Sequence, residues 1–364
     1  MRQIIVLLTV IFSMAMQNCQ TQSFDYPVSE FDDSSSFNLE KYSDIVPVRN
    51  EPNKVVEGWE NYYFLRSDCR CLFDGEYFVA VKDISPGVEN LMITLQGGGA
   101  SWPGMEKAKE EVYEKNVRVS NFAIALADRL EEEWNQVLLP YCDGSVFMGD
   151  RAADYDNDGI VDHFHWGFRA SSAAMALTKK KFPVLEKVMI TGCSAGGYGT
   201  IIMSRLVRHY YPEAKIYVIN ESGAGLLNPT DKETWESIKE TWKLDQLIPE
   251  DCDLCDGQLI YWYDAMLAKD SLLTIGLFSS YEDYVISDNF LEMTPEDFRS
   301  FLVEISGNLH EKYPRKFKRF FIEGNLHCIE DRYYKIDSIT YWDWVLQLMN
   351  ESEEWEDLLE LTPY

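Results

Sequence analysis

Basic residues are scarce in this chain: 33 lysines and arginines stand against 61 aspartates and glutamates, which gives a formal net charge of -28 over 364 residues. Nucleic-acid binding depends on clustered positive charge, so nucleic acid is excluded as an expected partner. A polyanionic substrate would be repelled over a long range, unless a local basic site or a bridging cation intervenes. The excess of acid otherwise keeps a protein soluble.

Long apolar runs are also scarce. The one clear run, Ile4–Met16, follows the positively charged Arg2 and is too short for a typical membrane span, so it indicates a signal peptide. We expect this peptide over 1–22, with cleavage after the small-x-small pattern Ser13-Met14-Ala15 or nearer Ser23. No transmembrane segment is expected elsewhere, and the sequence therefore predicts a secreted protein.

Secretion makes the eight cysteines disulfide candidates, and they lie at Cys19, Cys69, Cys71, Cys142, Cys193, Cys252, Cys255 and Cys328. The Cys69-x-Cys71 and Cys252-x-x-Cys255 pairs carry ligands that zinc accepts, but no histidine flanks them. Local or cross-loop disulfides are the better interpretation, and the spacing does not fix their pairing. Lipid anchoring at Cys19 is not expected, because small residues do not precede it.

Short apolar runs alternate with amphipathic stretches. The runs predict strands at Tyr77–Val81, Leu91–Leu95, Val188–Thr191, Ile216–Asn220, Leu272–Phe278 and Lys316–Ile322. Helical patterns lie near 170–181, 197–211, 231–243, 258–269 and 295–307. This alternation favours an α/β fold with a mostly parallel sheet and helices on both faces. We expect a flexible leader over 23–50 and one domain over 51–364, in which 225–271 is an inserted helical cap.

The most informative segment is Lys187–Gly199, which reads as a buried strand that ends on Gly-Cys-Ser-Ala-Gly-Gly before the amphipathic stretch Thr200–Tyr211. Gly192 and Gly196 flank Ser194 at two residues on either side, where a side chain would obstruct a sharp turn. A strand, a G-x-S-x-G turn and a helix form the nucleophile elbow of an α/β-hydrolase. Ser194 is therefore the predicted nucleophile.

An oxyanion hole is predicted upstream of this elbow. The strand Leu91–Leu95 is followed at once by Gln96 and three glycines. Their backbone N–H groups can approach a developing oxyanion closely. We expect Gly98 and Gly99 to donate there, together with the N–H of Ala195, which directly follows the nucleophile.

The catalytic acid is expected two strands after the elbow, beyond Leu272–Phe278. Asp283 is the favoured residue there, and its neighbour Glu282 is the closest alternative. Asp288 and Glu221 are more distant alternatives, since Glu221 ends a strand that comes one too early. A solvated surface carboxylate is the competing interpretation in so acidic a chain.

The catalytic base is expected after the last strand. Histidine occurs only at His163, His165, His209, His310 and His327. His327 alone follows the strand Lys316–Ile322 through a short loop. The order Ser194, Asp283, His327 is the nucleophile–acid–histidine order of the α/β-hydrolases. Cysteines flank two of these residues, Cys193 before the nucleophile and Cys328 after the base, and we interpret both as small buried packing residues.

These motifs carry a family resemblance. The chain resembles the pectin acetylesterase/Notum family of serine carboxylesterases, in particular its bacterial-type members, over about residues 65 to 348. The matching segments are Cys71–Gly75, Leu95–Gly99, Tyr141–Asp150, His165–Arg169, Thr191–Gly197 and His327-Cys328. The resemblance implies an α/β-hydrolase fold with the nucleophile at Ser194, the base at His327 and the acid within Tyr281–Asp283.

The sequence thus predicts a serine carboxylesterase that cleaves an ester, with O-acetyl esters of a polysaccharide as the first candidate and no cofactor in catalysis. A deacylase for longer lipid or protein acyl groups is the first alternative. A non-catalytic glycan-binding protein on a hydrolase scaffold is the second, because 10 Trp and 21 Tyr provide aromatic surface.

The segment Asp154–Asp162 matches the pattern of a calcium-binding loop. Its pattern D-x-D-x-D-G-x-x-D can direct alternating carboxylates at one centre, while Gly159 permits the sharp turn. The expected ligands are Asp154, Asp156, Asp158, the carbonyl group of Ile160, and Asp162. The glutamate usual at the twelfth position is replaced by His165. A structural calcium ion is predicted here, against the alternative of a solvated acidic loop.

Overall fold

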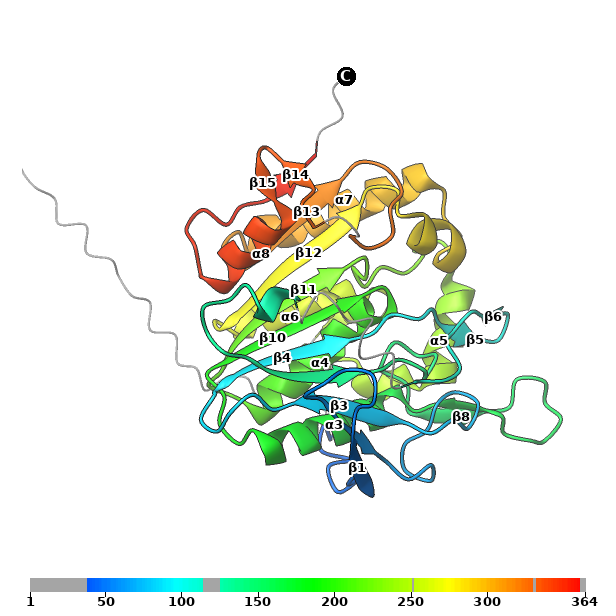
Figure 1. Cartoon of the computed structure of the whole chain (residues 1–364). Coiled ribbons are helices and arrows are strands. Elements are labelled where there is room, and N and C mark those ends of the chain that lie inside the picture. Colours follow the sequence, from blue (N-terminus) through cyan, green and yellow to red (C-terminus); the bar gives the residue numbers. More distant parts are fainter. Residues whose placement is uncertain (1–37, 114–124, 251, 330–331, 361–364) are drawn as a thin grey trace, which may run out of the picture.

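A ten-stranded sheet forms the centre of the molecule (Figure 1). The computed structural model describes residues 38–113, 125–250, 252–329 and 332–360. Across the sheet the strands are β1 (Arg49–Pro52), β2 (Glu60–Tyr63), β3 (Phe78–Lys82), β7 (Asn135–Leu139), β4 (Asn90–Leu95), β10 (Lys187–Cys193), β11 (Lys215–Glu221), β12 (Leu273–Ser280), β13 (Phe317–Ile322) and β16 (Leu358–Leu359). Neighbours from β1 to β7 pair antiparallel, and all those from β7 to β16 pair parallel.

Helices cover both faces of this sheet, and the alternation of strand residues shows which helix covers which face. Val188 and Ile190 of β10 join one hydrophobic core, while Met189 between them joins another. The first core contains residues of α3 (Gly167–Lys181), α4 (Ala195–Tyr210), α5 (Lys232–Trp242), α6 (Ile260–Lys269) and α7 (Pro295–Lys312). The second contains α8 (Tyr341–Met349), whose Trp344 is fully buried. The predicted α/β fold, mostly parallel with two helical layers, is confirmed.

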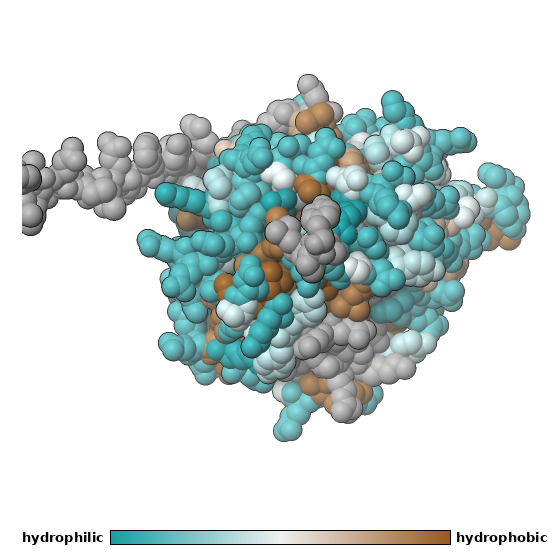
Figure 2. Space-filling model, turned by 90° about the horizontal axis from the view of Figure 1, so that it is seen from above, coloured by the Kyte–Doolittle hydropathy of each residue, from teal (hydrophilic) through white to brown (hydrophobic). Residues whose placement is uncertain are grey.

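Several short elements complete the described chain. They are the paired strands β5 (Ser101–Trp102) and β6 (Met105–Glu106), β8 (Arg151–Ala153) and β9 (His163–His165), β14 (Lys335–Ile336) and β15 (Ile339–Thr340), with the 3-10 turns η2 (Leu244–Leu247) and η3 (Asp253–Cys255) and the π-helix η4 (Val285–Phe290). Figure 2 shows hydrophilic residues over most of one face, with apolar residues in smaller patches between them.

The six predicted strands and five predicted helices all occur, with ends shifted by a few residues. The sequence did not predict the central strand β7, because it begins with Asn135 and Gln136, which are both buried. The side chain of Asn135 donates to the carbonyl group of Val88 at 2.9 Å and accepts from the N–H of Ile84 at 3.0 Å. A polar residue paired as Asn135 is fits inside a sheet, although its residue type is typical of a loop.

The predicted leader over 23–50 is only partly described, and the predicted signal peptide and Cys19 lie outside the described residues. Leu39 is buried, and its carbonyl group accepts a hydrogen bond from Ser172 of α3 at 3.0 Å. Lys41 and Tyr42 both bind the buried carboxylate of Asp150. Leu39, Lys41 and Tyr42 therefore contact the rest of the fold, and the leader over 23–50 as a whole stays a prediction. No helix among the described residues is long and apolar enough to cross a membrane.

Three disulfides join six of the seven described cysteines: Cys71–Cys142, Cys193–Cys328 and Cys252–Cys255. The predicted disulfides are therefore present, both cross-loop and local, and they use sulfur atoms that a zinc site would need. Cys69 is buried and carries a free thiol. The interpretation of Cys193 and Cys328 as packing residues is wrong, because the two residues, 135 positions apart, meet across the sheet and bond.

Candidate active site

Ser194 stands at the turn between β10 and α4, with a backbone φ of 60° and ψ of -124°. Left-handed backbone is unfavourable for a residue with a Cβ, and such conformations concentrate at functional sites. A Cβ at Gly192 would lie 2.3 Å from the carbonyl oxygen of Gly196, so the turn requires glycine there. The N–H of Ser194 donates to the carbonyl group of Glu221 at 2.9 Å, which fixes the turn against β11.

The glycine-rich segment after β4 lies against this turn. A Cβ at Gly97 would lie 2.5 Å from the carbonyl oxygen of Cys193 and 3.1 Å from the Cβ of Ser194. All three glycines, 97 to 99, line the same cavity as Ser194 and Ala195. Ala195 is the first residue of α4, whose N-terminus carries partial positive charge that favours a developing anion.

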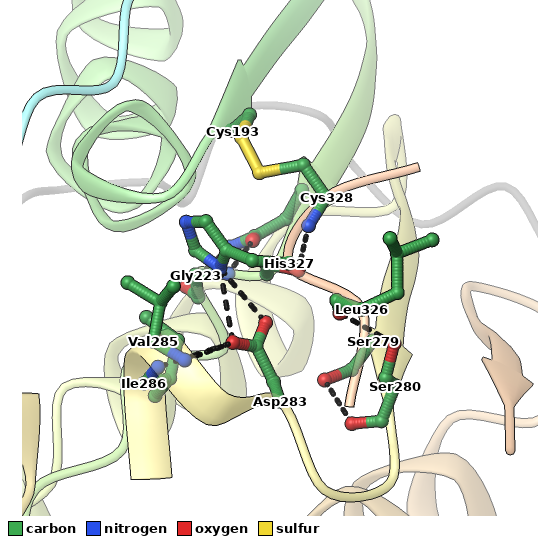
Figure 3. Close-up of polar contacts among 12 residues, drawn as sticks. Cys193, Gly223, Ser279, Ser280, Asp283, Val285, Ile286, Leu326, His327 and Cys328 are labelled. Atoms are coloured by element: carbon green, nitrogen blue, oxygen red, sulfur yellow. Dashed lines mark hydrogen bonds and ion pairs between the residues drawn. A yellow bond between two sulfur atoms is a disulfide. The ribbon is translucent and has the colours of Figure 1, made fainter. Parts of the chain in front are cut away.

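His327 and Asp283 are in contact, although 44 residues separate them (Figure 3). Nδ1 of His327 lies 3.0 Å from each carboxylate oxygen of Asp283. The buried Asp283 carboxylate also accepts the N–H groups of Val285 at 3.0 Å and Ile286 at 3.1 Å, at the start of η4. These hydrogen bonds hold the carboxylate towards the imidazole, and His327 lines the cavity that contains Ser194.

The other carboxylates weighed as the acid have different surroundings. Glu282 lies 3.3 Å from Arg299. Glu221 accepts the hydroxyl group of Tyr341 at 2.8 Å, and burial raises its pKa above the usual range. Asp288 is exposed. Of these four acids, Asp283 is the one that the structure brings to His327.

Hydrogen bonds from two neighbouring strand ends hold the loop that carries His327. Ser280 at the end of β12 donates its hydroxyl group to the carbonyl group of Leu326 at 2.5 Å. Ser222, which follows β11, accepts the N–H of Cys328 at 3.0 Å. The N–H of Glu282 donates to the carbonyl group of Gly324 at 3.0 Å. The loop is therefore fixed on both sides of the histidine.

These residues border a cavity of about 750 Å³. Much of its wall is apolar and is formed by Leu95, Ala100, Met105, Val146, Tyr198, Val285, Ile286 and Phe290. Two lysines stand at its edge: Lys109 donates to the carbonyl group of Gly97 at 2.8 Å, and Lys107 donates to that of Asn289 at 3.3 Å. Burial lowers the pKa of Lys109. This local positive charge contrasts with the net charge of -28.

The segment 225–271 borders a second cavity of about 140 Å³, which is lined by Leu227, Asn228, Asp231, Thr234, Trp235 and Ile238 on that side. Met105 and Phe290 line both cavities and stand between them. Within the described chain, the walls of the larger cavity come from other segments. A cap formed by 225–271 over the larger cavity therefore stays a prediction.

The candidate calcium loop brings three of its expected ligands together. Oxygen atoms of Asp154, Asp156 and Asp158 all lie within 4.8 Å of one another, a spacing that fits one calcium ion bound by oxygen. Asp162 instead lies 2.6 Å from Nδ1 of His163, outside this group. His165 is buried, with its Nε2 2.7 Å from the hydroxyl group of Tyr155, so it is not available as a twelfth-position ligand.

Two features of the site had only weak signals in the sequence. The disulfide Cys193–Cys328 lies next to both the predicted nucleophile and the predicted base, and this adjacency was the available signal. Phe290, at the end of η4, enters the cavity wall from a π-helix that no periodicity predicts. Bulges of this kind occur often at functional sites.

Comparison with known proteins finds a resemblance over part of the chain. Residues 128–252 match the family model described as Pectinacetylesterase. The predicted resemblance to the pectin acetylesterase family is confirmed. The match includes Ser194 but ends before Asp283 and His327, so it assigns no catalytic residues.

Two members of the pectin acetylesterase family from Arabidopsis thaliana are similar to part of the chain. Pectin acetylesterase 4 is 28% identical over 127 residues, which are 33% of this chain and 31% of that protein. Pectin acetylesterase 5 is 25% identical over 126 residues, which are 33% of this chain and 29% of that protein. The chain thus spans about a third of the length of these relatives.

A solved structure shows the same fold over a greater length. The crystal structure of the Wnt deacylase Notum from Drosophila superimposes with a TM-score of 0.53, covering 84% of this chain and 97% of that one. At 15% sequence identity this likeness concerns the fold. The predicted α/β-hydrolase fold is confirmed.

Proposed function

We propose that the protein is an exported serine carboxylesterase, with the O-acetyl esters of a polysaccharide as its first candidate substrate. The observation that carries this proposal is the pair of 3.0 Å contacts from Asp283 to Nδ1 of His327, at the cavity into which the Ser194 turn opens. Nucleophile, base and orienting acid are the parts that acyl transfer through an activated serine requires.

In the proposed mechanism, Asp283 sets the tautomer in which His327 acts as the general base. Its carboxylate accepts Nδ1–H, and Nε2 of His327 is then left without a proton and able to take one from Ser194. The serine oxygen attacks the ester carbonyl carbon, and the C–O bond to the alcohol breaks as His327 returns the proton to the leaving alcohol. Water then loses a proton to His327 and attacks the acyl-enzyme, which releases the acid and restores Ser194.

The negative charge that develops on the carbonyl oxygen needs backbone donors. We assign this role to the N–H groups of Gly98, Gly99 and Ala195. The position of the glycine segment against the Ser194 turn supports the assignment. One such donor contributes about 10²- to 10³-fold to kcat in comparable enzymes.

The substrate class is inferred from the cavity and from the relatives. A cleft of about 750 Å³ with lysines at its edge gives access to an ester on a large, oxygen-rich molecule. Its apolar wall favours a second candidate, a deacylase for longer acyl chains. A glycan-binding protein without activity is the third candidate, and we rank it last because it gives no role to the Asp283–His327 contact.

Three disulfides are typical of an oxidising compartment and support the proposed export.

Hydrolysis of p-nitrophenyl acetate, butyrate and palmitate by the purified protein tests the proposal, with Ser194→Ala as the control. Serine-dependent activity confined to acetate supports the polysaccharide deacetylase. Preference for palmitate moves the assignment to a long-chain deacylase. The absence of turnover on every ester by folded protein, with calcium present, contradicts the esterase and leaves the binding protein.

A further inference from the structure

We propose that the Cys193–Cys328 disulfide is a positioning element of the active site, which holds the imidazole of His327 within reach of Ser194. The inference rests on the proposed esterase function and extends it to two residues outside the triad. Its basis is sequence adjacency on both sides of the bond: Cys193 directly precedes Ser194, and Cys328 directly follows His327.

The sheet explains why such a bond is needed. Ser194 follows β10 and His327 follows β13, and two strands, β11 and β12, lie between them. Three strand spacings separate the two ends by about 14 Å. The loop after β13 must therefore cross the ends of β12 and β11 to bring its histidine to the serine.

Hydrogen bonds fix only part of this crossing. Those described above tie the loop to Ser280 at the end of β12 and to Ser222 after β11. The disulfide adds a covalent bond to β10 itself, the strand that carries the nucleophile, and the two cysteine Cα atoms lie 6.0 Å apart. The disulfide therefore ties the histidine loop directly to the residue that precedes Ser194.

The disulfide also lies beside the imidazole. One ring nitrogen of His327 and the sulfur atoms of Cys193 and Cys328 lie within 4.8 Å of one another. Figure 3 shows the imidazole between the disulfide and the Asp283 carboxylate. Asp283 holds Nδ1, and the disulfide restricts the backbone on the C-terminal side of the histidine.

Both chain segments joined by this bond adopt unfavourable backbone conformations. Ser194 has a φ of 60° and Cys328 a φ of 57°. A residue with a Cβ leaves the left-handed region easily unless the surrounding structure holds it there. The bond between the two segments supplies such a restraint, and its loss is expected to loosen both the serine turn and the histidine loop.

Reduction provides a test, because the disulfides differ in exposure. Cys193 and Cys328 are half-buried and Cys193 lines the open cavity, whereas Cys71 and Cys142 are fully buried. A small dithiol such as dithiothreitol attacks one sulfur, forms a mixed disulfide and then closes into a cyclic disulfide. The protein gains two electrons and two protons as the thiols of Cys193 and Cys328.

The experiment compares the double variant Cys193→Ser/Cys328→Ser with Cys252→Ser/Cys255→Ser, which removes a disulfide outside the cavity wall. We expect kcat for p-nitrophenyl acetate to fall by about 10²-fold in the first variant, the size that a small misplacement of a catalytic group produces. KM should change by less than about twofold, since serine keeps a side chain of similar size at both positions. The second variant should keep the wild-type kcat.

Dithiothreitol should lower the kcat of the wild type towards that of the first variant, reoxidation should restore it, and the first variant should not respond. These measurements on folded wild-type protein also decide the question if the double variant fails to fold. Wild-type kcat retained in the double variant, or in protein shown by mass spectrometry to be reduced at Cys193 and Cys328, overturns the proposal and leaves the bond a structural cross-link.

A readout independent of turnover separates this proposal from the esterase assignment. The NMR signal of the imidazole proton that His327 shares with Asp283 should be present in the wild type and in the Cys252→Ser/Cys255→Ser variant. It should be lost or broadened in Cys193→Ser/Cys328→Ser. An unchanged signal in that variant contradicts the positioning role. Wild-type protein that shows the signal but cleaves no ester contradicts the esterase assignment instead.

Discussion

Nδ1 of His327 lies 3.0 Å from both carboxylate oxygens of Asp283, and the neighbouring acid Glu282 lies by Arg299 instead. Two adjacent carboxylates thus have different partners. In the proposed mechanism only Asp283 selects the histidine tautomer and stabilises its charged form.

This separation gives a matched pair of variants. Asp283→Asn should lower kcat by about 10³- to 10⁴-fold, because an amide does not select the required tautomer. Glu282→Gln should leave kcat within about twofold of the wild type. Steady-state kinetics on p-nitrophenyl acetate check both, with circular dichroism to confirm folding. Equal losses in the two variants would contradict the assignment of the acid.

Phe290 should limit the length of acyl group that the enzyme accepts. Its ring stands between the two cavities and contacts Trp102 and Tyr198, with centroid distances of 5.5 and 5.3 Å. Phe290→Ala should join the cavities and raise kcat/KM for p-nitrophenyl octanoate relative to acetate by about tenfold, the scale of a few added apolar contacts. Phe290→Leu, which keeps most of the wall, is the control. An unchanged ratio in Phe290→Ala would show that the ring does not set the limit.

Calcium binding at the Asp154 loop stays a prediction. If the ion binds, calcium at about 100 times its Kd should stabilise the fold by about 2.7 kcal/mol and raise Tm. The double variant Asp156→Asn/Asp158→Asn should lose this response while keeping kcat, because Asp156 and Asp158 are not among the residues of the cavity wall. Calorimetric titration and thermal melts with and without chelator measure both effects. A wild-type Tm that calcium does not change contradicts the prediction.

Acid should destabilise the protein partly through His165. Burial lowers the pKa of His165 to about 3, from 6.5 in an exposed histidine. Below pH 6.5 the unfolded state therefore takes up a proton that the folded state does not, and stability is lost progressively as pH falls from 6.5 towards 3. His165→Gln removes this contribution. Its urea midpoint should fall less between pH 7 and pH 5 than that of the wild type, and equal slopes would contradict the buried, neutral histidine.

The sequence predicted those elements that depend mainly on neighbouring residues, namely the strand before Ser194 and the sharp turn at this serine. The apolar run before Ser194 and the glycines around it indicate a strand and a sharp turn from a few neighbouring residues. The order of strands then placed Asp283 and His327 at the same edge of the sheet, because the carboxyl ends of parallel strands meet there.

Long-range packing determines the parts that the sequence did not reveal. Strand β7 is polar at its start and is placed by its neighbours β3 and β4. The pairing of Cys193 with Cys328 depends on how the histidine loop crosses the sheet, which no spacing encodes. Asp283 and Glu282 are likewise distinguished only by the direction of each side chain in the folded turn.

The most direct test of the central claim is covalent labelling by a fluorophosphonate, followed by mapping of the modified peptide by mass spectrometry. Such reagents phosphonylate a serine that an adjacent base activates. We predict a single adduct on Ser194 that is absent in Ser194→Ala and strongly slowed in Asp283→Asn. An adduct on another residue, or folded wild-type protein that remains unlabelled, would contradict Ser194 as an activated nucleophile.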